Sequence, residues 1–407
     1  MRRQVLVLGL LLGAVLVVSV LTVPWDVLPG GQPHVDVARD FTPAQVARER
    51  AYHAALRPPA YASLAVSVLV AAVFGLSSAG ARLVGRLPGP WWVRVPTATV
   101  VVVLIGRLVT LPLDARSEVV QRQYGLSTQD WAGWIDDLLR GLGVQVLTTS
   151  LVLLVLIGLA RRTARWWAWG ALAAALLTVA GSFVYPLVVE PAFNRFSTLP
   201  AGPLRSDLLA LAARDHVPVR DVLVADASRR TTALNAYVSG FGSTRRIVLD
   251  DTLLKRSPPR EVELVIAHEL GHAKRQDVLH GTLIGAFGAA AGICALSLVL
   301  PVLLPRARVP SVGDPAVVPL VLLLVTVAPL LLLPLTNVVS RHIESRADVH
   351  ALDLTGDVPT FIASEQRLSV VNLSDLAPGT LVYGLFFDHP SGPQRIAIAR
   401  AWHQLHP

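Results

Sequence analysis

The chain has 407 residues, of which 53% are hydrophobic and only 16% are charged, and its mean hydropathy is +0.55. This composition excludes an ordinary soluble protein, because several apolar stretches approach the length of about 20 residues that crosses a bilayer. The formal net charge is +8. The arginines stand mainly at the ends of apolar stretches and form no stripe interleaved with aromatic residues, so we expect a lipid bilayer and no nucleic acid as partner.

Seven apolar stretches predict seven membrane helices. The first follows two arginines at the N-terminus and is long for a signal peptide, so a membrane helix is favoured over a cleaved leader. The stretches are residues 4–22, 61–81, 92–113, 141–160, 166–189, 278–304 and 316–336. We therefore expect an N-terminal membrane region of about five transmembrane helices over residues 1–189. A second region over residues 190–407 would contain the last two helices.

The polar segments between these stretches carry their own predictions. Ser117–Arg140 is polar with periodic apolar residues, which is typical of a surface helix. Charges return between residues 190 and 277, where Val222–Ala225, Asn235–Val238 and Arg246–Leu249 read as short strands before a helix that begins near Pro259. The predicted fold is mainly α: a polytopic membrane helix bundle with a small α+β domain at one membrane face.

The helix that begins near Pro259 contains the motif His268-Glu269-x-x-His272. Positions i and i+4 share one face of a helix, so both imidazoles can reach a single Zn²⁺ at about 2.0–2.1 Å. Glu269 is turned away from the ligands and can accept a proton from the attacking water. The motif therefore predicts a catalytic zinc site, and two histidines on a polar helix surface are the alternative.

A catalytic zinc site needs a third protein ligand. Glu344 lies about 70 residues after His272, beyond two predicted spans that form a hairpin and return the chain to the same membrane face. We therefore expect Glu344 to complete a two-His, one-Glu site. Asp348 lies one turn later and can accept a hydrogen bond from a ligand imidazole. An ordinary charged helix face is the alternative for both residues.

The chain resembles the type I CAAX prenyl protease family of integral-membrane gluzincins. The resemblance covers most of the chain and is weakest over the first 110 residues, which are similar in hydropathy only. It rests on the segments Tyr124–Thr128, Glu190–Phe196, Asp226–Thr231, Asn235-Ala236-Tyr237, His268–His272, Ser340–Asp348, and His389-Pro390-Ser391 with Arg395.

The resemblance implies roles for residues outside the metal set. It implies that His389 and Arg395 stabilise the tetrahedral intermediate, where a preorganised donor is worth about 3–4 kcal/mol. For Arg395, an ion pair with a carboxylate such as Asp388 is the alternative. It also implies that Asn235, Ala236 and Tyr237 form a strand that lies beside the bound peptide, since an exposed sheet edge can bind an extended chain. An ordinary strand is the alternative there.

Together these features predict a zinc-dependent membrane metalloendopeptidase with one Zn²⁺ per chain and a peptide or protein substrate. The alternative is a non-enzymatic transporter or scaffold with a structural metal site. Structural zinc usually has four protein ligands, often cysteines, and this chain has only Cys294, within an apolar stretch. A CAAX protein, a membrane protein under quality control and a peptide to be processed are alternative substrates.

The predictions for the side of the membrane oppose each other. With seven spans, the arginines that flank the apolar stretches fall on one side, and the positive-inside rule makes that side cytoplasmic. The metal motifs would then lie on the outer side of the cell membrane, whereas the resemblance implies a site on the cytoplasmic side. The arginines are Arg2, Arg3, Arg82, Arg86, Arg161, Arg162, Arg165, Arg306 and Arg308.

Overall fold

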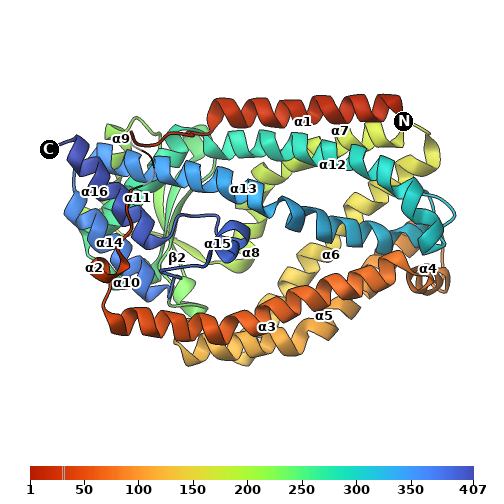
Figure 1. The fold of residues 1–407 in the computed structure, drawn as a ribbon, viewed down its shortest axis with the longest axis horizontal. Coiled ribbons are helices and arrows are strands. Elements are labelled where there is room, and N and C mark those ends of the chain that lie inside the picture. Colours follow the sequence, from red (N-terminus) through yellow and green to blue (C-terminus); the bar gives the residue numbers. More distant parts are fainter. Residues whose placement is uncertain (30, 32) are drawn as a thin grey trace.

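The computed structural model describes residues 1–29, 31 and 33–407. Figure 1 shows an elongated molecule in which long helices form a cage, and a compact domain with a small sheet lies at the end that carries the C-terminus. Within the described residues, seven helical segments are long and apolar enough to cross a membrane. The predicted mainly α bundle of seven spans is therefore confirmed.

The spans are longer than the apolar stretches that predicted them, because most continue beyond the apolar band into polar sequence. They are α1 (Arg2–Thr22), α3 (Pro43–Leu76), α5 (Trp91–Gln123), α6 (Trp131–Arg162), α7 (Trp166–Val184) with the π-helix η1 (Tyr185–Val189) and α8 (Glu190–Phe193), α12 (Asp277–Ala307), and α13 (Val318–Thr355) with the 3-10 helix η4 (Pro315–Val317).

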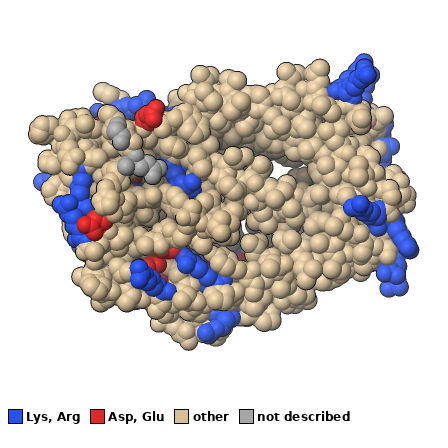
Figure 2. Space-filling model, viewed as in Figure 1, with Lys and Arg blue, Asp and Glu red and all other residues tan. Residues whose placement is uncertain are grey.

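The outer surface of the cage suits a lipid environment. Leu108 of α5 and Leu331 of α13 are 66% and 73% exposed, and Figure 2 shows a middle band almost free of charged side chains. Lys and Arg gather at the end opposite the compact domain, where Figure 1 places the N-terminus and α4 (Ser78–Gly85). Where the membrane helices pack together, Cys294 is fully buried in an apolar cluster that includes Ile157 and Leu300.

The prediction of a separate surface helix over residues 117–140 is wrong. Residues 117–123 form the last turns of α5, and α6 begins at Trp131 with the Asp130 side chain accepting a hydrogen bond from Gly133 N at 2.7 Å. The polar periodicity therefore came from two helix ends. Between them, Gly125 adopts a left-handed φ of 79°, which glycine tolerates without a steric penalty and which ends α5.

The compact domain contains one four-stranded sheet. Its strands are β1 (Phe196–Thr198), β2 (Asp221–Ala225), β3 (Ala236–Ser239) and β4 (Arg246–Asp250), in the order β1-β2-β4-β3. β2 and β4 are parallel, and the outer strands pair antiparallel to them. The three predicted strands are found within a residue of their expected bounds, and β1 was not predicted. Among the described strands, β3 pairs with β4 alone, so its other edge is free.

Helices cover the sheet and complete the domain. They are α2 (Val37–Asp40), α9 (Pro203–Arg214), α10 (Asp251–Arg256), α11 (Pro259–Lys274), α14 (Val358–Val371), α15 (Thr380–Phe386) and α16 (Gly392–Leu405), with short 3-10 turns η2 (Ala227–Arg229) and η3 (Gly242–Thr244). On α11, Val262, Ile266 and Leu270 repeat every four residues and are at most 1% exposed. This stripe anchors α11 in the core and leaves its other face for polar residues.

Candidate metal centre

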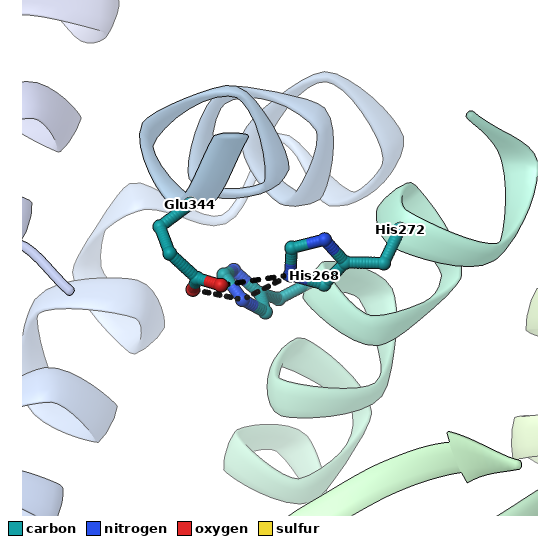
Figure 3. Close-up of side chains that lie close together, drawn as sticks. All are labelled: His268, His272 and Glu344. Atoms are coloured by element: carbon teal, nitrogen blue, oxygen red, sulfur yellow. Dashed lines mark hydrogen bonds and ion pairs between the residues drawn. The ribbon is translucent and has the colours of Figure 1, made fainter. Parts of the chain in front are cut away.

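Two helices bring three potential metal ligands together. His268 and His272 lie one turn apart on α11, and Glu344 reaches toward them from α13 (Figure 3). The Nε2 atoms of the two histidines are 3.2 Å apart. Glu344 Oε2 lies 3.2 Å from His268 Nε2, and Glu344 Oε1 lies 3.4 Å from His272 Nε2. The three donor groups therefore form a compact triangle.

The spacing of this triangle fits a tetrahedral ion. Two ligand atoms at about 2.0–2.1 Å from a tetrahedral zinc lie about 3.3 Å from each other, close to the distances among His268, His272 and Glu344. Glu344 Oε2 is also buried without a hydrogen-bond partner among the described residues. A buried carboxylate oxygen without a partner is costly unless a cation satisfies it, so the three side chains could hold a metal ion such as zinc.

Close packing between α11 and α13 sets the position of the ligands. A Cβ atom on Gly271 would lie only 3.0 Å from His350 Cδ2, so a larger residue there would require the His350 side chain to shift. Asp215, which is buried at the end of α9, accepts hydrogen bonds from His350 Nε2 at 2.9 Å and from Lys274 Nζ at 2.6 Å. A single carboxylate thus joins the two ligand-bearing helices on the side away from the metal triangle.

Each histidine is also oriented from its other nitrogen. Asp348 Oδ1 accepts a hydrogen bond from His268 Nδ1, and Asp277 Oδ2 accepts one from His272 Nδ1, both at 2.9 Å. These bonds fix the tautomer in which Nε2 carries the free lone pair that a metal needs. Asp277 was not among the residues selected from the sequence. Its position five residues after His272, at the first residue of a membrane helix, was the available signal.

The surroundings of the two histidines favour a cation. Burial lowers the pKa of His268, but the hydrogen bond to Asp348 and the nearby Glu344 carboxylate outweigh it and raise this pKa to about 9. Similarly, hydrogen bonds to Asp277 and Glu344 raise the pKa of His272 to about 10 against the effect of burial. The carboxylates that stabilise an imidazolium here would stabilise a metal dication in the same place.

Glu269 lies between the two histidines in sequence and lines a large cavity beside the triangle. Its side chain is partly buried. Burial raises the pKa of Glu269, and the neighbouring charges of His268 and His272 oppose that shift. A partly buried carboxylate on the same cavity wall as the three ligands can act as a general base.

The cavity has a volume of about 1190 Å³ and is large enough for several residues of a peptide. Besides the metal triangle, its wall includes the free-edge strand β3 with the preceding Asn235, and side chains from α3, α14 and the segment before α16. Ala236 and Tyr237, predicted as part of a peptide-binding strand, therefore lie on the cavity wall together with Asn235.

His389 lies on the same wall, in the segment between α15 and α16. Its Nε2 is 3.4 Å from Glu344 Oε2, and its Nδ1 donates to Asp388 Oδ1 at 2.8 Å. The bond to Asp388 raises the pKa of His389. The side chain is 55% exposed, so a substrate in the cavity could contact it.

Arg395 lies deeper than the sequence suggested. Its guanidinium forms ion pairs with Asp348 and with Glu365 Oε1, the latter at 3.0 Å, and not with Asp388. The alternative of an ion pair with a carboxylate is therefore found, but its partners are Asp348 and Glu365, because Asp388 pairs with His389 instead. Glu365 was also missed from the sequence. It is a single acidic residue on the buried face of α14, and burial raises its pKa to about 7 while Arg395 opposes the shift.

A membrane helix cage that holds a two-His, one-Glu triangle beside a peptide-sized cavity defines a membrane metalloprotease. Residues 198–403 match peptidase family M48, and residues 36–195 match the CAAX prenyl protease N-terminal region with five membrane helices. The chain therefore belongs to peptidase family M48 and is a multi-pass membrane protein.

Individual relatives agree with this assignment. The chain is 35% identical over 305 residues to the uncharacterized metalloprotease YhfN of Bacillus subtilis, which covers 73% of this chain and 71% of that protein. It is 30% identical over 308 residues to a CAAX prenyl protease 1 homolog of Oryza sativa, with the same coverage. The crystal structure of S. mikatae Ste24p has the same fold, with a TM-score of 0.72, 18% identity and coverage of 98% and 99%. The comparisons lend no support to a non-enzymatic transporter or scaffold.

Proposed function

We propose that the protein is a zinc-dependent metalloendopeptidase that cleaves peptide bonds inside the cavity. The observation that carries this proposal is the triangle of His268, His272 and Glu344, whose donor atoms lie 3.2–3.4 Å apart on the cavity wall. Zinc is favoured because two imidazoles and one carboxylate, with no cysteine nearby, match a common set of catalytic zinc ligands.

The protein residues divide the chemistry among them. Bound zinc would lower the pKa of water to about 7 and polarise the carbonyl of the scissile bond. Glu269 accepts the proton of the attacking water and can return it to the leaving amine. His389 donates a hydrogen bond to the carbonyl oxygen as negative charge develops there. Arg395 keeps Asp348 in place and so orients His268, which assigns it a different role from the one that the resemblance implied.

The substrate would bind as an extended strand. Among the described strands β3 has one free edge, and Asn235, Ala236 and Tyr237 line the cavity that contains the metal triangle. Backbone hydrogen bonds to a free edge tolerate many side chains, which suits a protease with varied substrates. The CAAX prenyl protease relatives make a prenylated C-terminal segment one candidate substrate, beside other peptides and membrane proteins.

The proposed function also divides the chain into two regions. Residues 1–189 would form the membrane region, and residues 190–407, with two further transmembrane helices, would form the peptidase region. The ends of the two matched segments, at residues 195 and 198, support a boundary near this point.

Cleavage of a peptide library by the detergent-purified protein tests the proposal. We expect cleavage between residues inside the peptides, its loss after treatment with a chelator, and its recovery on addition of about one equivalent of zinc. Cleavage that survives full removal of metal would contradict the proposal.

A further inference from the structure

The chain breaks sharply between the helix that carries the two histidines and the membrane helix that follows. Gln276 stands at this break with a left-handed φ of 57°, a conformation that is uncommon for residues other than glycine. On a continuous helix, residues five positions apart point in different directions. The break instead turns Asp277, the first residue of α12, back toward His272, so that its Oδ2 lies 2.9 Å from His272 Nδ1.

The second oxygen of Asp277 is held by an arginine from another helix. Arg346 Nη2 donates a hydrogen bond to Asp277 Oδ1. Arg346 lies on α13, two residues after Glu344. The ion pair therefore links the start of α12 to the helix that supplies the third ligand, and both side chains are largely buried.

The other end of the same guanidinium reaches the first membrane helix. Arg346 Nη1 donates to the backbone carbonyl of Thr22 at 2.9 Å, and Thr22 is the last residue of α1. The last carbonyls of a helix lack intrahelical partners and carry partial negative charge, so they attract a cation. Figure 1 shows α1 running alongside α12 from the N-terminus to the compact domain. Arg346 thus joins three helices at the edge of the metal triangle.

We infer that Arg346 is a positioning residue of the metal centre, which couples the end of α1 to His272 through Asp277. This inference rests on the proposed function, because it requires that His272 binds the metal. The planar guanidinium holds Asp277 Oδ1 and the Thr22 carbonyl at once, and this leaves Asp277 Oδ2 in a fixed place to orient His272. The affinity for metal therefore depends on the position of a membrane helix whose own residues supply none of the three ligands.

Metal affinity and ligand geometry in the full-length protein test this coupling. The dissociation constant for zinc is measured by competition with a chelator, and the ligand geometry is followed through the visible spectrum of the cobalt-substituted protein. Arg346→Met should weaken zinc binding by about 10-fold, the lower end of the range for residues that orient a ligand. It should also shift the cobalt spectrum. Arg346→Lys should give an intermediate loss, since one ammonium group keeps the charge near Asp277 but cannot bridge both acceptors.

Gln4→Ala is the matched control for loosened packing of α1. Gln4 Nε2 donates to Ser297 Oγ on α12 at 3.1 Å, so this change removes a contact of α1 without touching Arg346. We expect unchanged zinc affinity and an unchanged cobalt spectrum. An equal loss in Gln4→Ala would show that general packing is responsible and would overturn the inference.

A double variant of the full-length protein tests whether Arg346 acts through Asp277. If the coupling exists, Asp277→Asn and Arg346→Met should together weaken zinc binding by less than the sum of their separate free-energy effects. Unchanged zinc affinity in folded Arg346→Met would refute the coupling but leave the proposed function intact, whereas failure of the wild type to bind zinc would refute both.

Discussion

Asp348 and His268 are joined across 80 residues of sequence by a hydrogen bond of 2.9 Å from His268 Nδ1 to Asp348 Oδ1. Asp348 lies one turn beyond Glu344 on α13, so a single helix supplies both a metal ligand and the group that orients another ligand. We predict that Asp348→Asn lowers zinc affinity by about 10- to 100-fold, because the amide orients the imidazole less well. Competition with a chelator measures this loss, and unchanged affinity would remove Asp348 from the centre.

The general base is tested by a change that keeps the ligands. Glu269→Gln should retain one zinc per chain but lose nearly all peptidase activity, because the amide cannot accept the proton of the attacking water. Glu263→Gln, a half-buried residue of the same helix that does not line the cavity, is a control that should leave activity near that of the wild type. Near-normal turnover in Glu269→Gln would mean that the proton goes elsewhere.

The role of His389 is tested by separating kcat from KM. His389→Ala should lower kcat by about 100-fold or more with zinc still bound, which is the effect of removing one donor to the developing oxyanion. His403→Ala, an exposed histidine near the C-terminus, should have no such effect. If His389→Ala raised KM and left kcat unchanged, the residue would bind substrate and transition state equally, and its assigned role would be wrong.

Arg395 should behave as a structural cation. Its removal would leave Asp348 and Glu365 buried without their shared partner, and breaking a buried ion pair typically costs about 3–5 kcal/mol. Arg395→Met should therefore lower the thermal unfolding temperature and weaken zinc binding together. A variant with wild-type thermal stability and zinc affinity but a much lower kcat would instead support the role in transition-state stabilisation that the resemblance implied.

The metal triangle was accessible to sequence reasoning because its geometry is local. The spacing of His268 and His272 places them on one helix face whatever the rest of the fold does, and the hairpin of two membrane helices returns Glu344 to the same side. The number of spans was predictable for a similar reason, since each apolar stretch alone must satisfy the length of the bilayer. Both predictions therefore rest on sequence patterns within single helices, which do not depend on contacts with distant parts of the chain.

Features that depend on contacts between distant segments were not predictable. The partners of Arg395 come from α13 and α14, which meet α16 only in the folded protein. The link from Asp277 to His272 requires a left-handed residue at Gln276, a position where the sequence contains no glycine to signal a break. β1 has only three residues and forms by pairing with the edge of β2. The polar ends of α5 and α6 together showed the same periodicity as a single surface helix.

The zinc content of purified protein tests the central claim most directly. The wild type and Glu269→Gln should each contain about one zinc per chain, since both keep His268, His272 and Glu344 as a complete ligand set. His272→Ala should contain much less zinc under the same conditions, because two ligands hold the ion weakly. Wild-type protein without zinc, or undiminished zinc in His272→Ala, would contradict the account.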